Sequence, residues 1–275
     1  REAEELAAVL ENPAHVDLAE LDGALQAEAG LLGSSADDTL PEMLLEPLDR
    51  LRRTPAGVAL RERVVLLRDL PEPTDEMHWD RALRAVTWFL EQADAEGGLP
   101  LTGAGYLRPA AVEAASAVVP QMADWIGKNN REVQSAPLLY FRESLQQMKI
   151  LRKYKGALLP TRRARTLFQA GRIRELVLES LVPAPGDFDR PATALLLLHV
   201  ATTEPAQAIA TSEIAEALTQ LGWHVDGSPV PVSAIVELPA WQLLANIGEV
   251  AGRRRDRHWA FSPQASALAR EALIS

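Results

Sequence analysis

The sequence predicts a mainly α-helical protein, in which an N-terminal helical domain is followed by two tandem winged-helix-like units with short β-ribbons. Three observations support this prediction. Apolar residues recur at helical spacing along most of the chain. The middle of the chain has the element order helix, strand, helix, helix and two-stranded ribbon. The ribbon and the helix after it recur about a hundred residues later. The expected domains are residues 1–72, 73–182 and 183–275.

The composition is that of a globular protein. Of the 275 residues, 47% are apolar and 24% are charged, close to the average for folded domains. The chain has no cysteine, which excludes disulfides, thiolate metal sites and a cysteine nucleophile. No apolar run approaches the roughly 18 residues that a membrane-spanning helix needs. We therefore expect a cytoplasmic protein without a membrane partner. The chain begins at Arg1 rather than at Met, so we expect a segment upstream of it.

Charge is distributed unevenly along the chain. Residues 1–100 contain 22 acidic and nine basic residues, a net charge of −13, whereas residues 101–275 carry a net charge of +3. The overall charge of −10 argues against indiscriminate binding to nucleic acid, because such binding depends on a positive field around the whole protein. A local basic face on the second part of the chain remains compatible with this distribution.

The acidic domain expected at residues 1–72 is a series of short amphipathic helices. Pro41 and Pro55 suit the first turns of two of these helices. The prolines of the segment 71–74 interrupt helix formation, so we place a domain boundary there. Two earlier helix faces are indicated by apolar residues at spacings of three, four and seven: Leu6, Val9 and Leu10, and then Leu18, Leu21, Leu25 and Leu32.

The unit expected at residues 73–182 has the element order of a winged helix. Asp75 is a candidate N-cap for a helix that ends before Gly97 and Gly98. A strand-like piece at 99–102, a helix from Pro109 and a helix from about residue 137 follow. The segment 150–161 then reads as two strands joined at a Lys-Gly turn. The core stripe of the first helix is Trp79, Leu83, Val86 and Leu90.

The unit expected at residues 183–275 repeats this ending. Residues 150–167 align with residues 251–268 without a gap, and Thr161 and Ser262 then occupy equivalent helix N-cap positions. Helices are expected at 192–202, 211–221 and 238–250. A chance match is the alternative explanation for a repeat this short.

The segments that carry this pattern also resemble a known group of proteins. They are the run from Leu101 to Leu107, the wing sequence from Leu151 to Thr161, and the run from Ala194 to Leu198 that leads to Leu221, Gly222 and Trp223. Over residues 99 to about 270 the chain resembles the C-terminal region of uncharacterised actinobacterial proteins, some of which carry a domain like the plasmid pRiA4b ORF-3 product. Residues 1–98 do not resemble that domain. The resemblance implies the fold and carries no activity.

A basic segment is the main functional signal. No acidic residue lies between Glu143 and Glu175, and a second basic cluster occupies the corresponding turn near residue 255. In a winged helix the third helix enters the major groove and the wing contacts phosphate. The predicted nucleic-acid-binding residues are Arg142, Lys149, Arg152, Lys153, Lys155, Arg162, Arg163, Arg165, Arg253, Arg254, Arg255 and Arg257. A solvated surface, or arginines that pair with the acidic N-terminal part, is the alternative.

The sequence shows no recognisable catalytic or metal-binding motif. The five histidines lack the spacing of a zinc site, and no phosphate loop or nucleophile elbow is present. We therefore expect a non-enzymatic protein without cofactor or metal. An enzyme whose site has no known motif is the least favoured alternative.

Together these observations predict a non-enzymatic winged-helix protein that is DNA-binding or transcription-associated, with double-stranded DNA as its partner. The alternative is a protein–protein interaction scaffold that does not bind DNA and that contacts another protein or a second copy of itself, because a winged helix does not dictate its use.

Overall fold

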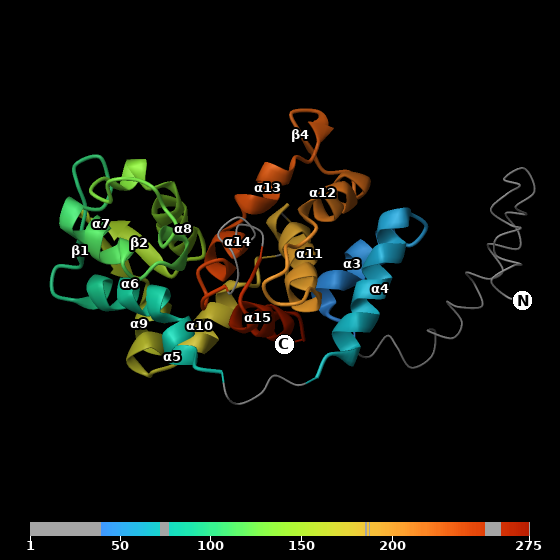
Figure 1. Ribbon diagram of the computed structural model, residues 1–275, viewed down its shortest axis with the longest axis horizontal. Coiled ribbons are helices and arrows are strands. Elements are labelled where there is room, and N and C mark those ends of the chain that lie inside the picture. Colours follow the sequence, from blue (N-terminus) through green and yellow to red (C-terminus); the bar gives the residue numbers. More distant parts are fainter. Residues whose placement is uncertain (1–39, 72–76, 185, 187, 251–259, 275) are drawn as a thin grey trace, which may run out of the picture. The chain divides into compact units, whose positions relative to one another are not determined.

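The computed structural model describes residues 40–71, 77–184, 186, 188–250 and 260–274 (Figure 1). The described residues from Pro41 onward belong to one compact unit. Three sequence-based predictions lie outside the described residues. They are the helix faces before residue 40, the Asp75 cap, and the basic cluster of Arg253, Arg254, Arg255 and Arg257. The mainly helical class with small antiparallel sheets is confirmed. The expected domain boundaries stay predictions.

No helix among the described residues is both long and apolar enough to cross a membrane.

The first two helices of the described chain form a hairpin that packs on a later helix. They are α3 (Glu42–Arg50) and α4 (Pro55–Asp69), and both contact α11 (Asp189–Thr202). The Thr54 Oγ1 atom accepts a hydrogen bond from the Gly57 N–H group at 3.2 Å and so caps α4. A Cβ atom at Gly57 would lie only 1.9 Å from the Leu51 carbonyl oxygen, so this close turn requires glycine.

The next elements follow the predicted order. They are α5 (Trp79–Ala82), α6 (Arg84–Asp94), β1 (Leu99–Pro100) and α7 (Pro109–Ser116). Leu83, Val86 and Leu90 of the predicted stripe are buried, whereas Trp79 is half-buried with the Arg174 guanidinium 4.7 Å from its ring. Gly97 and Gly98, both at positive φ, form the turn that leads from α6 into β1.

A long connection leads from α7 to the helix α8 (Ala136–Gln147). It contains the short 3-10 helices η3 (Pro120–Met122) and η4 (Glu132–Gln134). The strands β2 (Leu151–Tyr154) and β3 (Ala157–Pro160) then form an antiparallel hairpin, and β1 pairs with β3 to give the strand order β1-β3-β2. Lys155 and Gly156, both at positive φ, form the two-residue turn that the sequence predicts. The helices α9 (Arg162–Gln169) and α10 (Ile173–Ser180) follow.

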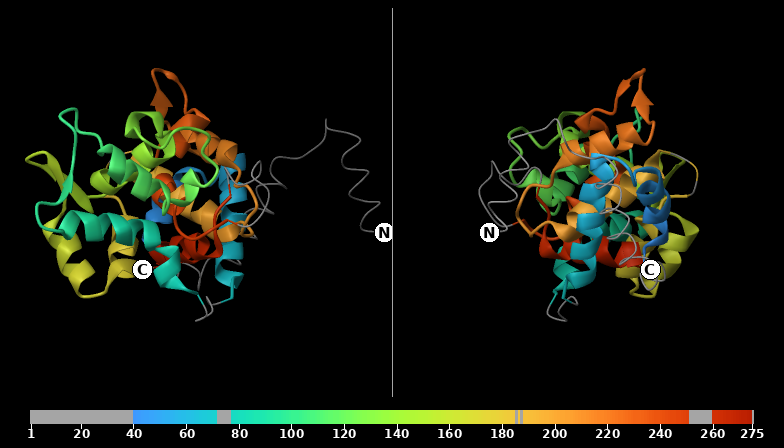
Figure 2. Two further views of the ribbon diagram at one scale, coloured as in Figure 1. Left: turned by 60° about the vertical axis from the view of Figure 1, so that its left-hand side comes forward. Right: turned by 90° about the vertical axis from the view of Figure 1, so that its right-hand side faces the viewer.

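The last part of the chain contains α11, α12 (Thr211–Gln220), α13 (Val232–Val236), α14 (Pro239–Leu244) and α15 (Pro263–Ile274). The sequence did not predict a small hairpin of β4 (His224–Val225) and β5 (Ser228–Pro229), which projects between α12 and α13 (Figures 1 and 2). The helix expected at 238–250 ends at Leu244, so that prediction was too long. Ala208 forms an isolated antiparallel bridge with Ala260.

Two equivalent hydrogen-bond arrangements start α9 and α15. The Thr161 hydroxyl donates to the Lys149 carbonyl oxygen and accepts from the Ala164 N–H group. The Ser262 hydroxyl likewise donates to the Ile247 carbonyl oxygen and accepts from the Ala265 N–H group. Each cap therefore joins a final helix to the chain that follows an earlier helix, and the N-cap predictions at Thr161 and Ser262 are confirmed.

The most consequential contact in the structure joins α8 and α14 (Figure 1). The α14 residues Ala240 to Leu244 are all buried, and Trp241 is only 1% exposed. Asn246, just after α14, is fully buried, and its Oδ1 atom accepts a hydrogen bond from the Gln121 N–H group at 3.1 Å. The two helices expected to be the third helices of two winged units therefore cover each other.

A buried histidine lies where α4, α11 and α12 meet. His199 is 1% exposed, and its Nδ1 atom lies 3.9 Å from the Glu213 carboxylate. That carboxylate is held by Arg63 at 3.1 Å, so the cation also faces the imidazole. Burial, together with Arg63, lowers the pKa of His199 from 6.5 to about 3. The folded protein thus keeps this imidazole neutral.

We predict that the stability of the protein falls with acidity partly because of this residue. The unfolded chain binds a proton at His199 below pH 6.5, whereas the folded chain does so only near pH 3. The free energy of unfolding then decreases by up to about 1.4 kcal/mol per pH unit in this window. In His199→Leu, urea unfolding between pH 6.5 and 5 shows a shallower pH dependence. An unchanged dependence contradicts the prediction.

Candidate nucleic-acid interface

The wing, defined here as the β2–β3 hairpin of residues 151–160, presents a run of exposed charged and aromatic side chains. Leu151 is buried, but the next four residues, Arg152, Lys153, Tyr154 and Lys155, are exposed. The pattern arises because β2 is an edge strand, paired only with β3. The turn at Lys155 and Gly156 then carries the chain back into β3, which is largely buried.

A second turn of the chain supports the tip of the wing. The Leu101 N–H group donates to the Gly156 carbonyl oxygen at 2.8 Å, and Leu101 forms an antiparallel bridge with Leu107. A Cβ atom at Gly105 would lie 3.3 Å from the Lys153 Nζ atom. The 101–107 loop and the wing therefore lie side by side at one edge of the unit, as the left view of Figure 2 shows.

The predicted basic residues separate into two groups according to their partners. Four cations between residues 144 and 174 form ion pairs: Arg163 with Glu179, Arg165 with Asp94, Arg172 with Glu175, and Arg174 with Glu271. Within the described parts of the chain, the other five have no carboxylate partner and are exposed: Lys149, Arg152, Lys153, Lys155 and Arg162.

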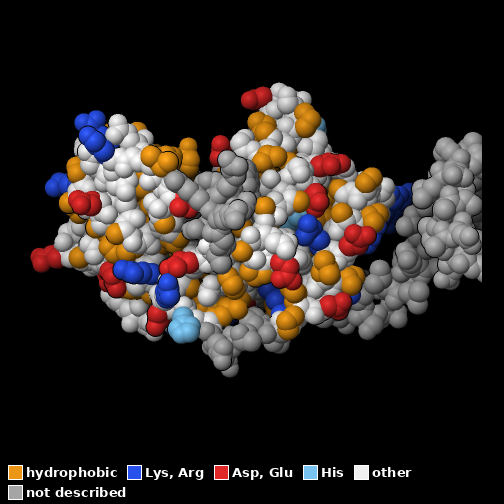
Figure 3. Space-filling view, in the orientation of Figure 1, with side chains coloured by type: hydrophobic (Ala, Val, Ile, Leu, Met, Phe, Trp, Pro, Cys, Tyr) orange, Lys and Arg blue, Asp and Glu red, His pale blue; other side chains and the backbone are white. Residues whose placement is uncertain are grey.

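The five unpaired cations lie on the wing or at its base. Lys149 and Arg162 are brought to the base because the Thr161 hydroxyl, next to Arg162 in sequence, binds the Lys149 carbonyl oxygen at 2.7 Å. On the face drawn in Figure 3, Lys and Arg side chains gather at the upper left, above β1 and α7, whereas acidic and basic side chains are mixed over the rest. The alternative expected from the sequence is that arginines pair with the acidic N-terminal part. Arg165 does pair with Asp94, within the acidic first hundred residues, whereas Arg163 pairs with Glu179. The wing cations have no carboxylate partner among the described residues.

Arg142 does not belong to this surface, which corrects the sequence-based expectation. The residue is 0% exposed, and its Nε atom donates to the Glu132 Oε1 atom at 2.8 Å. The other carboxylate oxygen of Glu132 accepts from the Leu107 N–H group at 2.7 Å. The helical spacing placed Arg142 opposite the apolar stripe, but α8 is covered on more than one side, so that face is also buried.

The sequence analysis missed one candidate contact residue, Tyr154. Its ring is 48% exposed, with the Arg152 guanidinium carbon 5.0 Å and the Lys155 Nζ atom 5.3 Å from its centroid. Cations at these distances are attracted to the negative face of the ring. An aromatic residue interleaved in a basic run was the signal that pointed to it.

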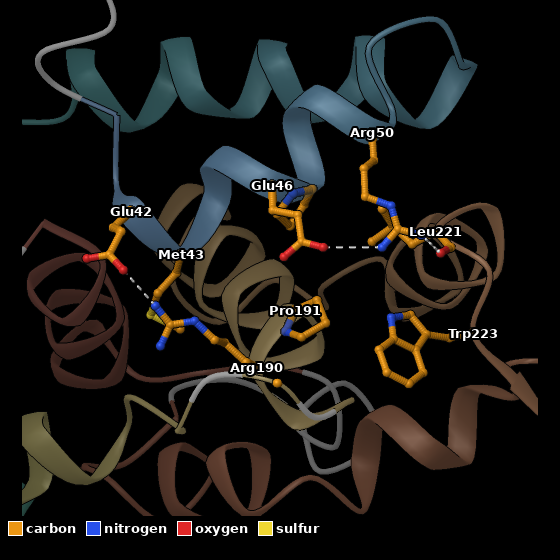
Figure 4. A pocket seen from close by; sticks show the side chains of 10 residues that line it. Glu42, Met43, Glu46, Arg50, Arg190, Pro191, Leu221 and Trp223 are labelled. Atoms are coloured by element: carbon orange, nitrogen blue, oxygen red, sulfur yellow. Dashed lines mark hydrogen bonds and ion pairs between the residues drawn. The ribbon is translucent and has the colours of Figure 1, made fainter.

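Two cavities in the described part of the chain are lined by charged side chains that pair with one another. One, of about 160 Å³, lies between α3 and the start of α11 (Figure 4). It is lined by the ion pairs Glu42–Arg190 and Glu46–Arg50, and Trp223 forms one wall. A second cavity, of about 460 Å³, includes the exposed pair Arg81–Glu249. His78 also lines the second cavity, beside the Arg81–Glu249 pair.

Within the described residues, no group of three or more histidine, aspartate or glutamate side chains is placed to hold a metal ion.

Comparison with known protein families finds one match. A family model described as the Y4jL N-terminal domain matches residues 80–172, from within α5 to just beyond α9, and so includes the wing. The chain is thus similar to this family over about a third of its length. The resemblance to proteins with ORF-3-like domains gains no support from this match and stays a prediction. No curated protein and no solved structure matches the chain.

We predict that the Glu132–Arg142 pair stabilises the connection between α7 and α8. Glu132→Ala leaves the Arg142 charge buried without its main partner, and we expect a loss of about 3–5 kcal/mol in the free energy of unfolding. The double variant Glu132→Gln with Arg142→Met removes both charges and keeps an acceptor for the Leu107 N–H group, so it loses much less. Urea denaturation measures both. An equal loss in the two variants contradicts the prediction.

Proposed function

We propose that the protein binds the phosphate backbone of nucleic acid through the wing and its base, without reading base edges by a helix in the major groove. The observation that carries this proposal is the group of five exposed cations, Lys149, Arg152, Lys153, Lys155 and Arg162, which have no carboxylate partner in the described structure. Cations of this kind release counterions from phosphate groups when they bind nucleic acid.

The element order supports a winged-helix assignment for the first predicted unit, residues 73–182. The order α6, β1, α7, α8, β2, β3 and the strand order β1-β3-β2 are those expected of a three-helix core with a wing. In that fold the hairpin lies where it contacts the phosphate backbone. The exposed run from Arg152 to Lys155 is therefore at the position from which phosphate contacts are made.

The second predicted unit, residues 183–275, supports two winged-helix-like units in tandem. The helices α11, α12 and α14 follow in the same order, Ala208 bridges Ala260 as β1 pairs with β3, and the Ser262 cap repeats the Thr161 cap. In the gapless sequence alignment of residues 150–167 with 251–268, the basic cluster at 253–257 corresponds to the first wing. We propose that this cluster, with Arg253, Arg254, Arg255 and Arg257, adds a second phosphate contact.

The packing of α8 on α14 favours backbone contact over base reading. A recognition helix must expose one face to enter the major groove. Here the two candidate helices are buried against each other, and Arg142 is engaged with Glu132. The protein therefore suits binding that depends on charge rather than on base sequence.

We predict that neutralising the wing weakens binding more than neutralising paired arginines. The triple variant Arg152→Gln, Lys153→Gln, Lys155→Gln loses tenfold or more in affinity for a labelled mixed-sequence 30-mer, on the order of the loss expected for three phosphate contacts. The slope of log affinity against log salt concentration decreases by about 2 to 3. Fluorescence anisotropy at several salt concentrations measures both quantities.

The matched control is the triple variant Arg163→Gln, Arg165→Gln, Arg172→Gln, which removes the same charge from residues that form ion pairs. We expect its affinity to change by less than about threefold, since those charges are already partly neutralised. Equal losses in the two variants mean that net charge alone matters. No binding at the lowest salt concentration rules out the proposal and favours the protein-interaction scaffold.

A further inference from the structure

The ring of Tyr154 is held at the tip of the wing by local geometry. Tyr154 pairs with Ala157 in the last register position before the turn, so its side chain lies at the end of the hairpin. The next two residues, Lys155 and Gly156, take up positive φ and reverse the chain directly. The Leu101 N–H group binds the Gly156 carbonyl oxygen, which anchors the turn to the neighbouring loop. The ring is thus presented on a supported hairpin.

The surroundings of the ring are cationic. The Arg152 guanidinium and the Lys155 ammonium lie 5.0 and 5.3 Å from its centroid, and the ring remains 48% exposed. A nucleobase that stacked on this ring would have its phosphates next to these cations. An exposed cation–π contact is weaker than a base–aromatic stack, so a base can displace one of the cations from the ring.

Tyr154 differs from the similarly exposed Tyr140 of α8 because two cations lie within about 5 Å of its ring. The helices α8 and α14, which would otherwise present side chains to base edges, are buried against each other. In a duplex the base faces are stacked on one another, and an aromatic ring reaches them only after they unstack. In a single strand the faces are free, and stacking on aromatic side chains tolerates any sequence.

We infer that the wing binds single-stranded nucleic acid in preference to duplex, with Tyr154 stacking on an unpaired base while Arg152, Lys153 and Lys155 contact the adjoining phosphates. This inference rests on the proposed function and adds the class of nucleic acid that the wing selects. Tyr154 is the residue that distinguishes the two forms, since the cations bind phosphate in either of them.

The experiment compares a labelled single-stranded 30-mer with its own duplex, by anisotropy at one salt concentration. We expect the intact chain to bind the single strand more tightly than the duplex. Tyr154→Ala then weakens single-strand binding by roughly fivefold to a hundredfold, the range for loss of one base stack, and changes duplex binding by less than about twofold. Tyr154→Phe keeps the preference, because stacking needs the ring and not the hydroxyl.

Two further variants keep this test specific. Tyr154→Leu retains an apolar side chain without a stacking face, and we expect it to behave like Tyr154→Ala. Tyr140→Ala removes an equally exposed tyrosine, 51% against 48%, from α8 rather than from the wing, and we expect no change in either affinity. A preference that survives in Tyr154→Leu overturns stacking as its cause.

The outcomes separate this inference from the proposed function. If Tyr154→Ala weakens both forms equally or neither, while the wing triple variant still loses tenfold or more in affinity, the inference fails and phosphate binding by the wing stands. If neither nucleic acid binds the intact chain at low salt, both fail. The inference is supported only if Tyr154→Ala lowers the affinity for the single strand and leaves the affinity for the duplex unchanged.

Discussion

The packing of α8 against α14 is the constraint on which the rest of the structure depends. The α14 residues in this region are buried, and Trp241 also packs edge-on against Phe261. Asn246, just after α14, accepts a hydrogen bond from the Gln121 N–H group in η3. Close-packed interiors of this kind resist sliding and separation. The two halves are further joined by Gly248, whose N–H group donates to the Ala82 carbonyl oxygen, and by the Arg174–Glu271 pair. The described chain from Pro41 onward accordingly forms one compact unit.

This packing explains which charges are available to a partner. Cations on α9 and α10 face carboxylates that the fold brings near them from α6, α10 and α15, so Arg163, Arg165 and Arg174 are partly neutralised. The side chains from Arg152 to Lys155 on the wing are exposed and meet no carboxylate among the described residues. A basic run of sequence thus becomes a much smaller basic surface, and that surface lies at one edge of the unit. Exposed ion pairs contribute little to stability, so their larger effect here is to define this surface.

The packing of the two halves also determines which surfaces of the chain are exposed. A winged helix that reads sequence exposes its third helix, whereas this chain uses both candidate third helices as an internal contact between its halves. What remains exposed is the wing, supported by the 101–107 loop through the Leu101–Gly156 hydrogen bond. The match to the Y4jL N-terminal domain covers the part of the chain that builds this wing, from residue 80 to residue 172. A supported hairpin with one exposed ring is suited to contacts that do not depend on base order.

The sequence by itself determined the helical class, most helices, the wing turn at Lys155 and Gly156, and the caps at Thr161 and Ser262, because these follow from local spacing and backbone preference. It did not determine that Arg142 is buried, that α14 ends at Leu244 or that Arg163 and Arg165 are paired. Those features depend on which distant surfaces meet. Helical periodicity identifies a polar face on α8 but contains no information about the segments that pack against this helix, such as η4, which carries Glu132, and α14. Only the tertiary structure decided which of the predicted cations are free to bind a partner, since burial and ion pairing are both set by contacts between segments far apart in the chain.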